Sequence, residues 1–277
     1  MELWMTEYQT PHLGLSVRVK ETLYSGQSDY QTIAVVDTEP FGRMLVLDGV
    51  FQTSVADEFV YHEMIAHVPL CAHPNPKRVL VIGGGDGGTV REVVKHPSVE
   101  QVVMVEIDGM VVDVAKRYLP EIAEALITGH PKLDLRIEDG IRHVQEKRDY
   151  YDVIIVDCSD PIGPGTGLFN YEFYQSARQA LKSDGIFVQQ TESPFVHTDL
   201  IKRVWGELSS LFPVTKLYLA AIPLYPSGTH CFTMASKRYD PLAADTDKKP
   251  EFATKYHNRE IQKSCFVLPN FIRELLT

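Results

Sequence analysis

The sequence RVLVIGGGDGGTV, residues 78–90, is the strongest indication of architecture in this chain of 277 residues. An apolar run leads into three glycines, an aspartate and two more glycines. A strand that ends in a glycine loop and continues into a helix is the first unit of a nucleotide-binding α/β sheet. Asp86 in this loop would repel a phosphate, and the loop carries no basic residue. A cationic nucleoside ligand therefore fits better than a dinucleotide.

Strands and helices alternate after residue 78. The candidate strands cover residues 78–82, 101–107, 133–137, 152–156, 185–190, 215–222 and 231–236. The candidate helices cover residues 89–95, 110–118, 141–147, 171–181, 199–212 and, at the end of the chain, about 270–276. This alternation predicts an α/β fold with a doubly wound, mostly parallel sheet. Ligands of such sheets bind beyond the carboxyl ends of the strands.

The first part of the chain has a different texture. Apolar runs at residues 15–22, 31–37 and 44–53 predict β structure, and the separating breaks are Gly26, residues 40–42 and Asp48-Gly49. The Asp-Gly pair predicts a hairpin turn. A helix is expected over residues 57–67, with Asp57 as its N-cap. We expect an N-terminal β domain, residues 1–55, and a Rossmann-like catalytic domain of the class I methyltransferase type, residues 56–277.

Composition narrows the classes of function. Hydrophobic residues make up 44% of the chain and charged residues 23%, which is typical of a soluble globular protein. The net charge of -10 argues against a general nucleic-acid partner, which would require a basic face. No apolar run is long enough to cross a membrane, and the first residues do not resemble a signal peptide. The four cysteines show no CxxC pairing, so we expect a cytoplasmic protein with neither disulfides nor a metal site.

Acidic residues follow several of the predicted strands. They are Asp86, Glu106, Asp139 (followed by Gly140), Asp157 and Asp160. Glu106 lies about 20 residues after the glycine loop, where an acid binds ribose hydroxyls, whereas the neighbouring Asp108 is placed to cap a helix. Any one of these acids alone would fit a cap or a loop, but their succession at strand ends predicts a site. Enzymes that use NAD and enzymes that use sulfonium donors share this pattern, and Asp86 favours the sulfonium class.

Four motifs extend this interpretation. They are DEFVYHEM at residues 57–64, GGGDGG at 83–88, DCSDPIGPGTGLF at 157–169 and IPLYPSG at 222–228. In order and spacing they resemble the polyamine aminopropyltransferases, above all the spermidine synthases, over nearly the whole chain. The resemblance implies transfer of an aminopropyl group from decarboxylated S-adenosylmethionine, as a co-substrate, to putrescine. It also implies that no prosthetic group takes part and that the chain forms a homodimer or homotetramer.

The resemblance also implies residue roles. The donor would be bound by Gln31, Gly83, Gly85, Asp86, Glu106, Asp139, Gly140 and Pro164, with Pro164 against the adenine. The acceptor would be bound by His62, Asp86, Asp157, Asp160, Gln190 and Tyr225. Catalysis would fall to Asp157 and Tyr61. A primary ammonium has a pKa near ~10 and must lose a proton as it attacks, so an acid that ends a strand is suited to accept that proton.

Three alternatives remain open at this point. The chain departs from the usual family pattern at Leu224, at residues 166–167 and at residues 229–230, all on the acceptor side. Cadaverine, agmatine or spermidine could therefore replace putrescine. A methyltransferase that uses intact S-adenosylmethionine is a second alternative, against which Asp86 speaks as an ammonium anchor. A non-catalytic polyamine sensor is a third, but a sensor would not need Asp157 as a proton acceptor.

Overall fold

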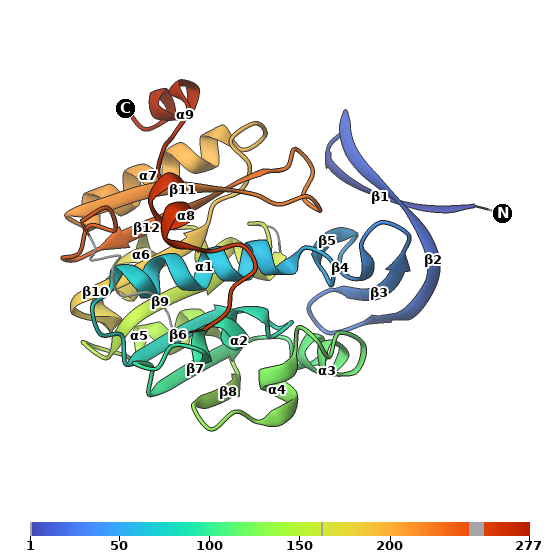
Figure 1. Ribbon diagram of the computed structural model, residues 1–277, viewed down its shortest axis with the longest axis horizontal. Coiled ribbons are helices and arrows are strands. Elements are labelled where there is room, and N and C mark those ends of the chain that lie inside the picture. The colour runs from blue at the N-terminus through green and yellow to red at the C-terminus, as the bar shows by residue number, and fades with distance from the viewer. Residues whose placement is uncertain (1, 162, 244–251) are drawn as a thin grey trace.

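The computed structural model describes residues 2–161, 163–243 and 252–277, without the side chain of Pro164. It contains a seven-stranded sheet with the order β11-β12-β10-β9-β6-β7-β8 and a five-stranded sheet with the order β1-β2-β3-β4-β5 (Figure 1). The strands of the large sheet are β6 (Arg78–Gly83), β7 (Gln101–Glu106), β8 (Leu133–Ile137), β9 (Tyr151–Asp157), β10 (Leu181–Gln190), β11 (Val214–Ala221) and β12 (Thr229–Ser236).

The large sheet is mostly parallel, as predicted. Strands β6 to β10 pair with one another in parallel, and β12 pairs antiparallel with both β10 and β11. From β6 the chain moves outward to β7 and β8, and it then returns to place β9 on the other side of β6. The strand order therefore reverses between β6 and β9, which is where sheets of this kind bind their ligands.

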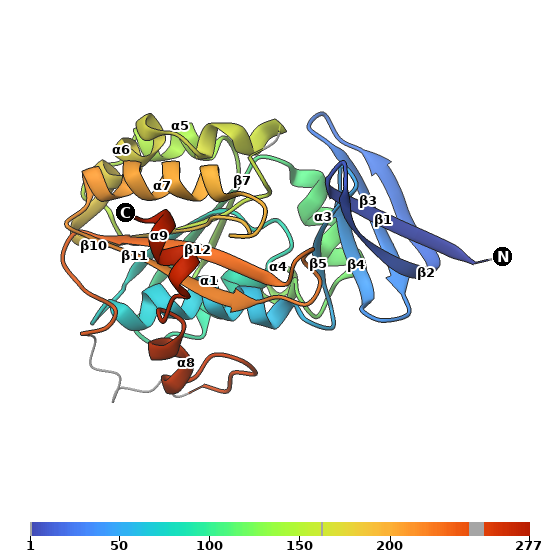
Figure 2. The same cartoon turned by 90° about the horizontal axis from the view of Figure 1, so that it is seen from above.

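Helices cover both faces of this sheet (Figure 2). They are α1 (Glu58–Ala72), α2 (Gly88–Val94), α3 (Gly109–Tyr118), α4 (Glu124–Thr128), α5 (Gly140–Gln145), α6 (Tyr171–Ala180), α7 (Thr198–Leu211), α8 (Arg259–Ser264) and α9 (Asn270–Leu275), with a 3-10 turn at Gly163–Leu168. Helices α1 and α2 pack in one apolar core, and α5, α6 and α7 pack in the other. Because both faces are covered, β6 and β9 are continuous runs of buried valine, leucine and isoleucine.

The small sheet consists of β1 (Leu3–Thr10), β2 (Leu13–Gln27), β3 (Thr32–Thr38), β4 (Gly42–Leu47) and β5 (Val50–Ser54). Asp48 and Gly49 have φ of 49° and 84°, so the predicted hairpin turn between β4 and β5 is confirmed. Ile33, Val35 and Leu45 of this sheet pack against apolar residues of α3. This contact holds the small sheet beside the carboxyl edge of the large one.

Two local expectations are wrong. Gly26 was expected to separate two strands, but it lies inside β2, where the Tyr24 side chain occupies the space that a Cβ would fill. Asp57 was expected to cap α1, but its side chain accepts hydrogen bonds from the Ser54 hydroxyl (2.6 Å) and the Leu224 N–H (2.7 Å) instead. The carboxylate thus joins the small sheet to the segment before β12. The expected cap at Asp108 is confirmed.

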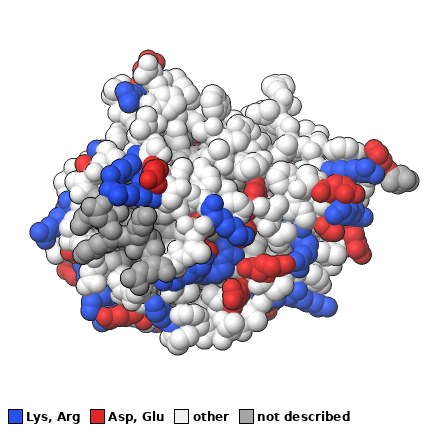
Figure 3. Space-filling view, viewed as in Figure 1, with Lys and Arg blue, Asp and Glu red and all other residues white. Residues whose placement is uncertain are grey.

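The surface carries charges of both signs. Positive and negative side chains lie next to one another on the face shown in Figure 3. No helix in the described part of the chain is long and apolar enough to span a bilayer.

Candidate active site

Two adjoining cavities lie at the carboxyl edge of the large sheet, where β6 and β9 meet. The first is lined by the predicted donor-binding residues Gln31, Gly83, Gly85, Asp86, Glu106, Asp139 and Gly140. The second is lined by Asp160 and Gln190 and shares Tyr61 and Tyr225 with the first. Asp157 and His62 line the first cavity. The fold therefore gathers the predicted site residues at one edge, except Pro164, whose side chain lies outside the description.

Asp157 ends β9 between two hydroxyl donors. Its Oδ1 accepts a hydrogen bond of 2.8 Å from the Tyr61 hydroxyl, and its Oδ2 accepts one of 2.7 Å from Thr89. Burial raises the pKa of Asp157, and the nearby charge of Asp86 raises it further. Burial and the charge of Asp157 raise the pKa of Tyr61 well above its usual value, so the phenol stays protonated and donates. The Tyr61 hydroxyl is therefore the hydrogen-bond donor of this pair, and the Asp157 carboxylate is the acceptor.

The glycine loop allows β6 to approach Asp157. Gly83 has φ of 82°, and a Cβ at this position would lie 2.1 Å from the backbone oxygen of Asp157. The Gly84 N–H donates to that same oxygen at 2.7 Å. A Cβ on Gly85 would lie 3.1 Å from Oε2 of Glu106. The glycines thus make room for the acids of the site as well as for a ligand.

Glu106 is a buried acid that lines the first cavity. Its Oε1 accepts the N–H of Asp108 at 2.9 Å, and burial raises its pKa to about 7. Gln31 reaches this rim from the small sheet and donates to Oδ2 of Asp108 at 2.9 Å. Asp139 caps α5 through a hydrogen bond of 2.8 Å from the N–H of Ile141. Asp139 therefore both caps α5 and lines the first cavity.

The second cavity has aromatic walls. The rings of Tyr61 and Tyr225 lie 6.0 Å apart, and His230 lies 5.0 Å from Tyr225. Burial lowers the pKa of His230 to about 3, so this ring is neutral, and its Nε2 lies 3.0 Å from the Gln190 side-chain oxygen. Such walls suit a chain of methylene groups that ends in ammonium groups.

The lining residues of the second cavity that were missed in the sequence include three polar ones, Glu7, Gln52 and Glu192. Glu192 is buried with φ of 65°, and burial, strengthened by Asp160, raises its pKa well above the usual range. It lies just beyond the carboxyl end of β10, so the rule that found the other acids could have found it. The sequence did not predict Glu7 as a site residue. It lies in β1 of the small sheet, where apolar and polar residues do not alternate regularly.

The described residues contain one cluster with metal-ligand spacing, His73, Asp152 and Asp184. It lies at the opposite end of the large sheet from the two cavities. The Lys182 ammonium already contacts both carboxylate oxygens of Asp152 at 2.8 Å. Nδ1 of His73 accepts the N–H of Asn75 at 3.2 Å, so the neutral ring carries its proton on Nε2, the atom that faces Asp184. The Asp152 carboxylate of this cluster is thus already paired within the protein.

Comparisons with known proteins agree with this geometry. Residues 58–246 match the family model described as "Spermine/spermidine synthase domain", and residues 3–54 match the "Spermidine synthase tetramerisation domain". The chain is 54% identical to a polyamine aminopropyltransferase of Moorella thermoacetica, over 99% of this chain and 96% of the relative. It is 52% identical to one of Caldicellulosiruptor saccharolyticus, over 100% of this chain and 99% of the relative.

Solved structures show the same likeness. A spermidine synthase in complex with the transition-state analogue AdoDATO has a TM-score of 0.96 and 43% identity, over 99% of this chain and 94% of the other. The spermidine synthase from Thermotoga maritima has a TM-score of 0.93 and 41% identity, with the same coverage. The fold and the site define an aminopropyltransferase. The chain belongs to the spermine/spermidine synthase family.

Proposed function

We propose that this enzyme is a spermidine synthase, which transfers the aminopropyl group of decarboxylated S-adenosylmethionine to putrescine. The products are spermidine and methylthioadenosine. The observation that carries the proposal is the position of Asp157, which faces the first cavity while its partner Tyr61 lines both cavities. A base at that junction can take a proton from an amine in one cavity as it attacks a donor in the other.

The donor side supports a cationic nucleoside. In our proposal Glu106 binds the ribose hydroxyls, Gln31 and residues 139–140 hold the nucleoside, and Asp86 attracts the ammonium of the aminopropyl group. Asp86 lies in the loop after β6, and its Oδ1 accepts the N–H of Gly88 at 2.7 Å. The glycines of the loop let the donor approach the backbone.

On the acceptor side, Asp160, Gln190 and Tyr225 would hold putrescine between the aromatic walls. Glu7 and Glu192 add acidic groups to the same cavity. The attacking nitrogen forms a bond to the carbon attached to sulfur, the C–S bond breaks, and its electron pair stays on sulfur. The nitrogen's proton passes to Asp157. The positive sulfonium leaves as a neutral thioether, and alignment of the two substrates supplies much of the rate, up to ~7–11 kcal/mol in well-oriented systems.

We also propose that the chain is divided near residue 55 and that the small sheet assembles the enzyme into a dimer or tetramer. The sheet matches a model described as a tetramerisation domain, and its outer strands expose large apolar side chains. These are Leu3, Trp4, Tyr8 and Leu13. The four cysteines are unpaired, as expected of a protein in the reducing cytoplasm, where we place it.

The test is a competition between amines. The purified protein is incubated with decarboxylated S-adenosylmethionine and equal amounts of isotope-labelled putrescine and unlabelled cadaverine, agmatine and spermidine. The products are identified by mass spectrometry, in which newly made spermidine carries the label. Spermidine and methylthioadenosine in equal amounts are expected. A different aminopropylated amine would correct the acceptor, and methylated products from intact S-adenosylmethionine would indicate a methyltransferase. Amine binding without any product would indicate a sensor.

A further inference from the structure

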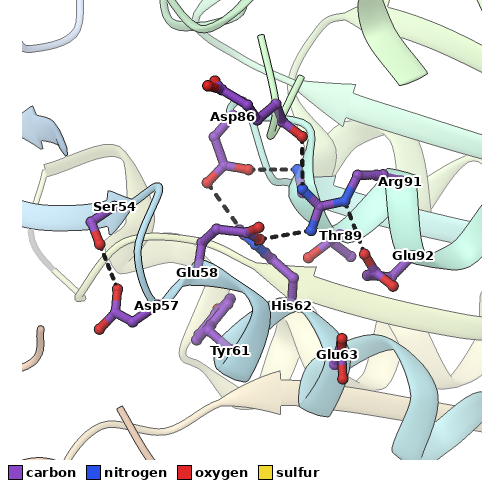
Figure 4. A network of polar contacts seen from close by, with 12 residues as sticks. Ser54, Asp57, Glu58, Tyr61, His62, Glu63, Asp86, Thr89, Arg91 and Glu92 are labelled. Carbon is purple, nitrogen blue, oxygen red and sulfur yellow. Dashed lines mark hydrogen bonds and ion pairs between the residues drawn. The ribbon is translucent and has the colours of Figure 1, made fainter. Parts of the chain in front are cut away.

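A row of charged or ionisable side chains extends from Asp86 through His62 and Glu58 to Arg91 (Figure 4). Oδ2 of Asp86 lies 3.4 Å from Nε2 of His62, and Nδ1 of His62 lies 2.6 Å from Oε2 of Glu58. The same Glu58 oxygen accepts a hydrogen bond of 2.7 Å from Arg91. The side chains of His62 and Glu58 are only 2% and 6% exposed. Water therefore contributes little to the solvation of these charges, and each must be matched by its neighbours.

Both ring nitrogens of His62 face carboxylate oxygens. An ionised carboxylate only accepts hydrogen bonds, and a neutral imidazole has a single N–H to donate. Only the doubly protonated ring can donate on both sides. Burial works to lower the pKa of His62, but Asp86 and Glu58 outweigh it and raise that pKa well above its usual value. With both nitrogens engaged, the ring has none left to bind the acceptor amine.

The glycine motif makes room for this ring. A Cβ on Gly88 would lie 2.2 Å from Cε1 and Nδ1 of His62. Gly88 also donates its N–H to Oδ1 of Asp86 at 2.7 Å. Asp86 is thus held from two directions, by the first residue of α2 and by the ring of α1. The last glycine of GGGDGG is therefore needed because a larger residue would collide with the His62 side chain, independently of any ligand.

We propose that His62 and Glu58 are positioning residues, which hold Asp86 ionised toward the donor so that the proton of the acceptor amine passes to Asp157 alone. This inference rests on the proposed function, because it concerns how two acids of the site divide their roles. Asp86 would anchor a cation throughout the reaction, and Asp157 would be the only one of the two to gain a proton. Arg91 keeps Glu58 in place from α2.

The pKa values of the two acids shift in opposite directions, although His62 works to lower both. Burial works to raise the pKa of Asp86, but His62 reverses this and lowers it. The charge of Asp86 adds to burial in raising the pKa of Asp157. The environment therefore separates two carboxyls that would otherwise share a proton. The titratable or charged groups that face His62 are Glu58 and Tyr61 of α1, Asp86 of the β6–α2 loop, Arg91 of α2 and Asp157 of β9.

The first experiment measures the charge of His62 directly. Histidine-labelled protein is titrated by NMR, and the His62 signal among the ten histidines is identified by its loss in His62→Gln. We expect the wild-type ring to stay protonated through pH 8. Glu58→Gln keeps an acceptor oxygen for Nδ1 but removes the charge, so the midpoint should fall by ~1 unit or more. A ring that is neutral at pH 7 in the wild type, or a midpoint unmoved by Glu58→Gln, would overturn the proposal.

Glu100→Gln is the matched control. Glu100 is an exposed glutamate that pairs with Lys77 at 2.7 Å, far from the cavities, so its replacement removes the same charge without touching the row. It should leave both the His62 titration and the activity unchanged. A His62 midpoint that shifts as much in Glu100→Gln as in Glu58→Gln would mean that net charge, and not the contact, sets the protonation of the ring.

The second experiment links this charge to the reaction. In His62→Gln, the acidic limb of kcat/KM for the donor should move upward by ~1 pH unit, with rates at pH 7 reduced ~10-fold or more. Glu58→Asp should restore much of the Glu58→Gln loss, because it restores the charge. If His62→Gln is folded and active and the acidic limb of its kcat/KM profile does not move, the positioning role is overturned. A wild-type protein that makes no product would instead refute the proposed function, and the NMR result would still stand.

Discussion

Strand β9 carries an aspartate near each end, and the surroundings shift the pKa values of the two in opposite directions. Asp152, at the start, accepts the N–H groups of Lys77 (3.1 Å) and Arg78 (2.8 Å) and pairs with the Lys182 ammonium. Burial works to raise its pKa, but these partners lower it. Asp157, at the end, has two neutral hydroxyl partners, and its pKa is raised. One residue type on one strand is a saturated structural acid at one edge and, in our proposal, the reactive acid at the other.

The difference lies in what each edge leaves for a ligand. At the amino edge, the ammonium of Lys182 and the N–H groups of Lys77 and Arg78 already occupy the carboxylate oxygens of Asp152. A cationic ligand would therefore find no free acceptor there. At the carboxyl edge, the charges of Asp86 and Asp157 exceed what His62 can match alone. Unmatched negative charge in a buried cavity attracts cationic substrates and costs stability while the cavity is empty. The following predictions test whether this contrast is functional.

The largest effect is expected for Asp157→Asn. The variant keeps the size of the side chain and an oxygen for the Tyr61 or Thr89 hydroxyl, but an amide cannot take a proton from the amine. The loss of a general base typically lowers kcat ~10²–10⁴-fold. Donor affinity should stay nearly intact, because the donor's predicted anchors lie elsewhere in the cavity. Steady-state kinetics and calorimetry measure the two quantities separately, and a kcat within a few-fold of the wild type would remove Asp157 from the mechanism.

The next effect concerns Asp86 and the choice of donor. Intact S-adenosylmethionine carries a carboxylate near the ammonium that Asp86 is proposed to bind. Two such charges 4 Å apart repel by roughly 4 kcal/mol at an effective dielectric constant of 20. Asp86→Asn should weaken binding of the decarboxylated donor and narrow its advantage over the intact one by up to ~1000-fold. Calorimetry with both donors tests this, and an unchanged affinity ratio would show that Asp86 is not the selector.

A moderate effect is expected when the pH is lowered. The rate should rise from pH 6 toward pH 9, because the attacking amine is more readily deprotonated there. Burial and Asp86 raise the pKa of Asp157, so at lower pH the base itself is lost as the pH falls through that value. The pKa of Asp152 is lowered, so its stabilising contribution is complete above the unfolded value near ~3.9 and is lost only as the pH falls through the lower folded value. Activity should therefore disappear before the fold does. Rates and near-ultraviolet circular dichroism measured in parallel from pH 9 to pH 4 would check the order, and simultaneous loss would contradict it.

The sequence predicted this contrast only in part. The glycine loop and the acids after the strands could be found because parallel strands end at a common edge, which follows from local pattern alone. Glu7 could not be found, because it reaches the second cavity from a different sheet. The contacts of His62 and Glu58 with Asp86 and Arg91 could not be predicted either. Glu58 and His62 are one helical turn apart in DEFVYHEM, but they meet Asp86 and Arg91 only because α2 packs against α1. Asp57 was misread for a similar reason, since Leu224, its distant partner, is visible only in the fold.

The smallest effect is expected at the other end of β9. Asp152→Asn keeps one oxygen for the N–H of Arg78 but removes the charge that faces Lys182, so unfolding should become easier by about 1 kcal/mol. The value of kcat should stay unchanged, because the cavities proposed to bind the substrates lie at the other edge of the sheet. Urea denaturation measures the first and steady-state kinetics the second. Glu100→Gln, which removes an exposed lysine-paired acid, should cost measurably less stability. If Asp152→Asn is as stable as Glu100→Gln, saturation of Asp152 does not stabilise the sheet. If it lowers kcat instead, the two ends of the strand are coupled, and the division between a structural edge and a reactive edge is wrong.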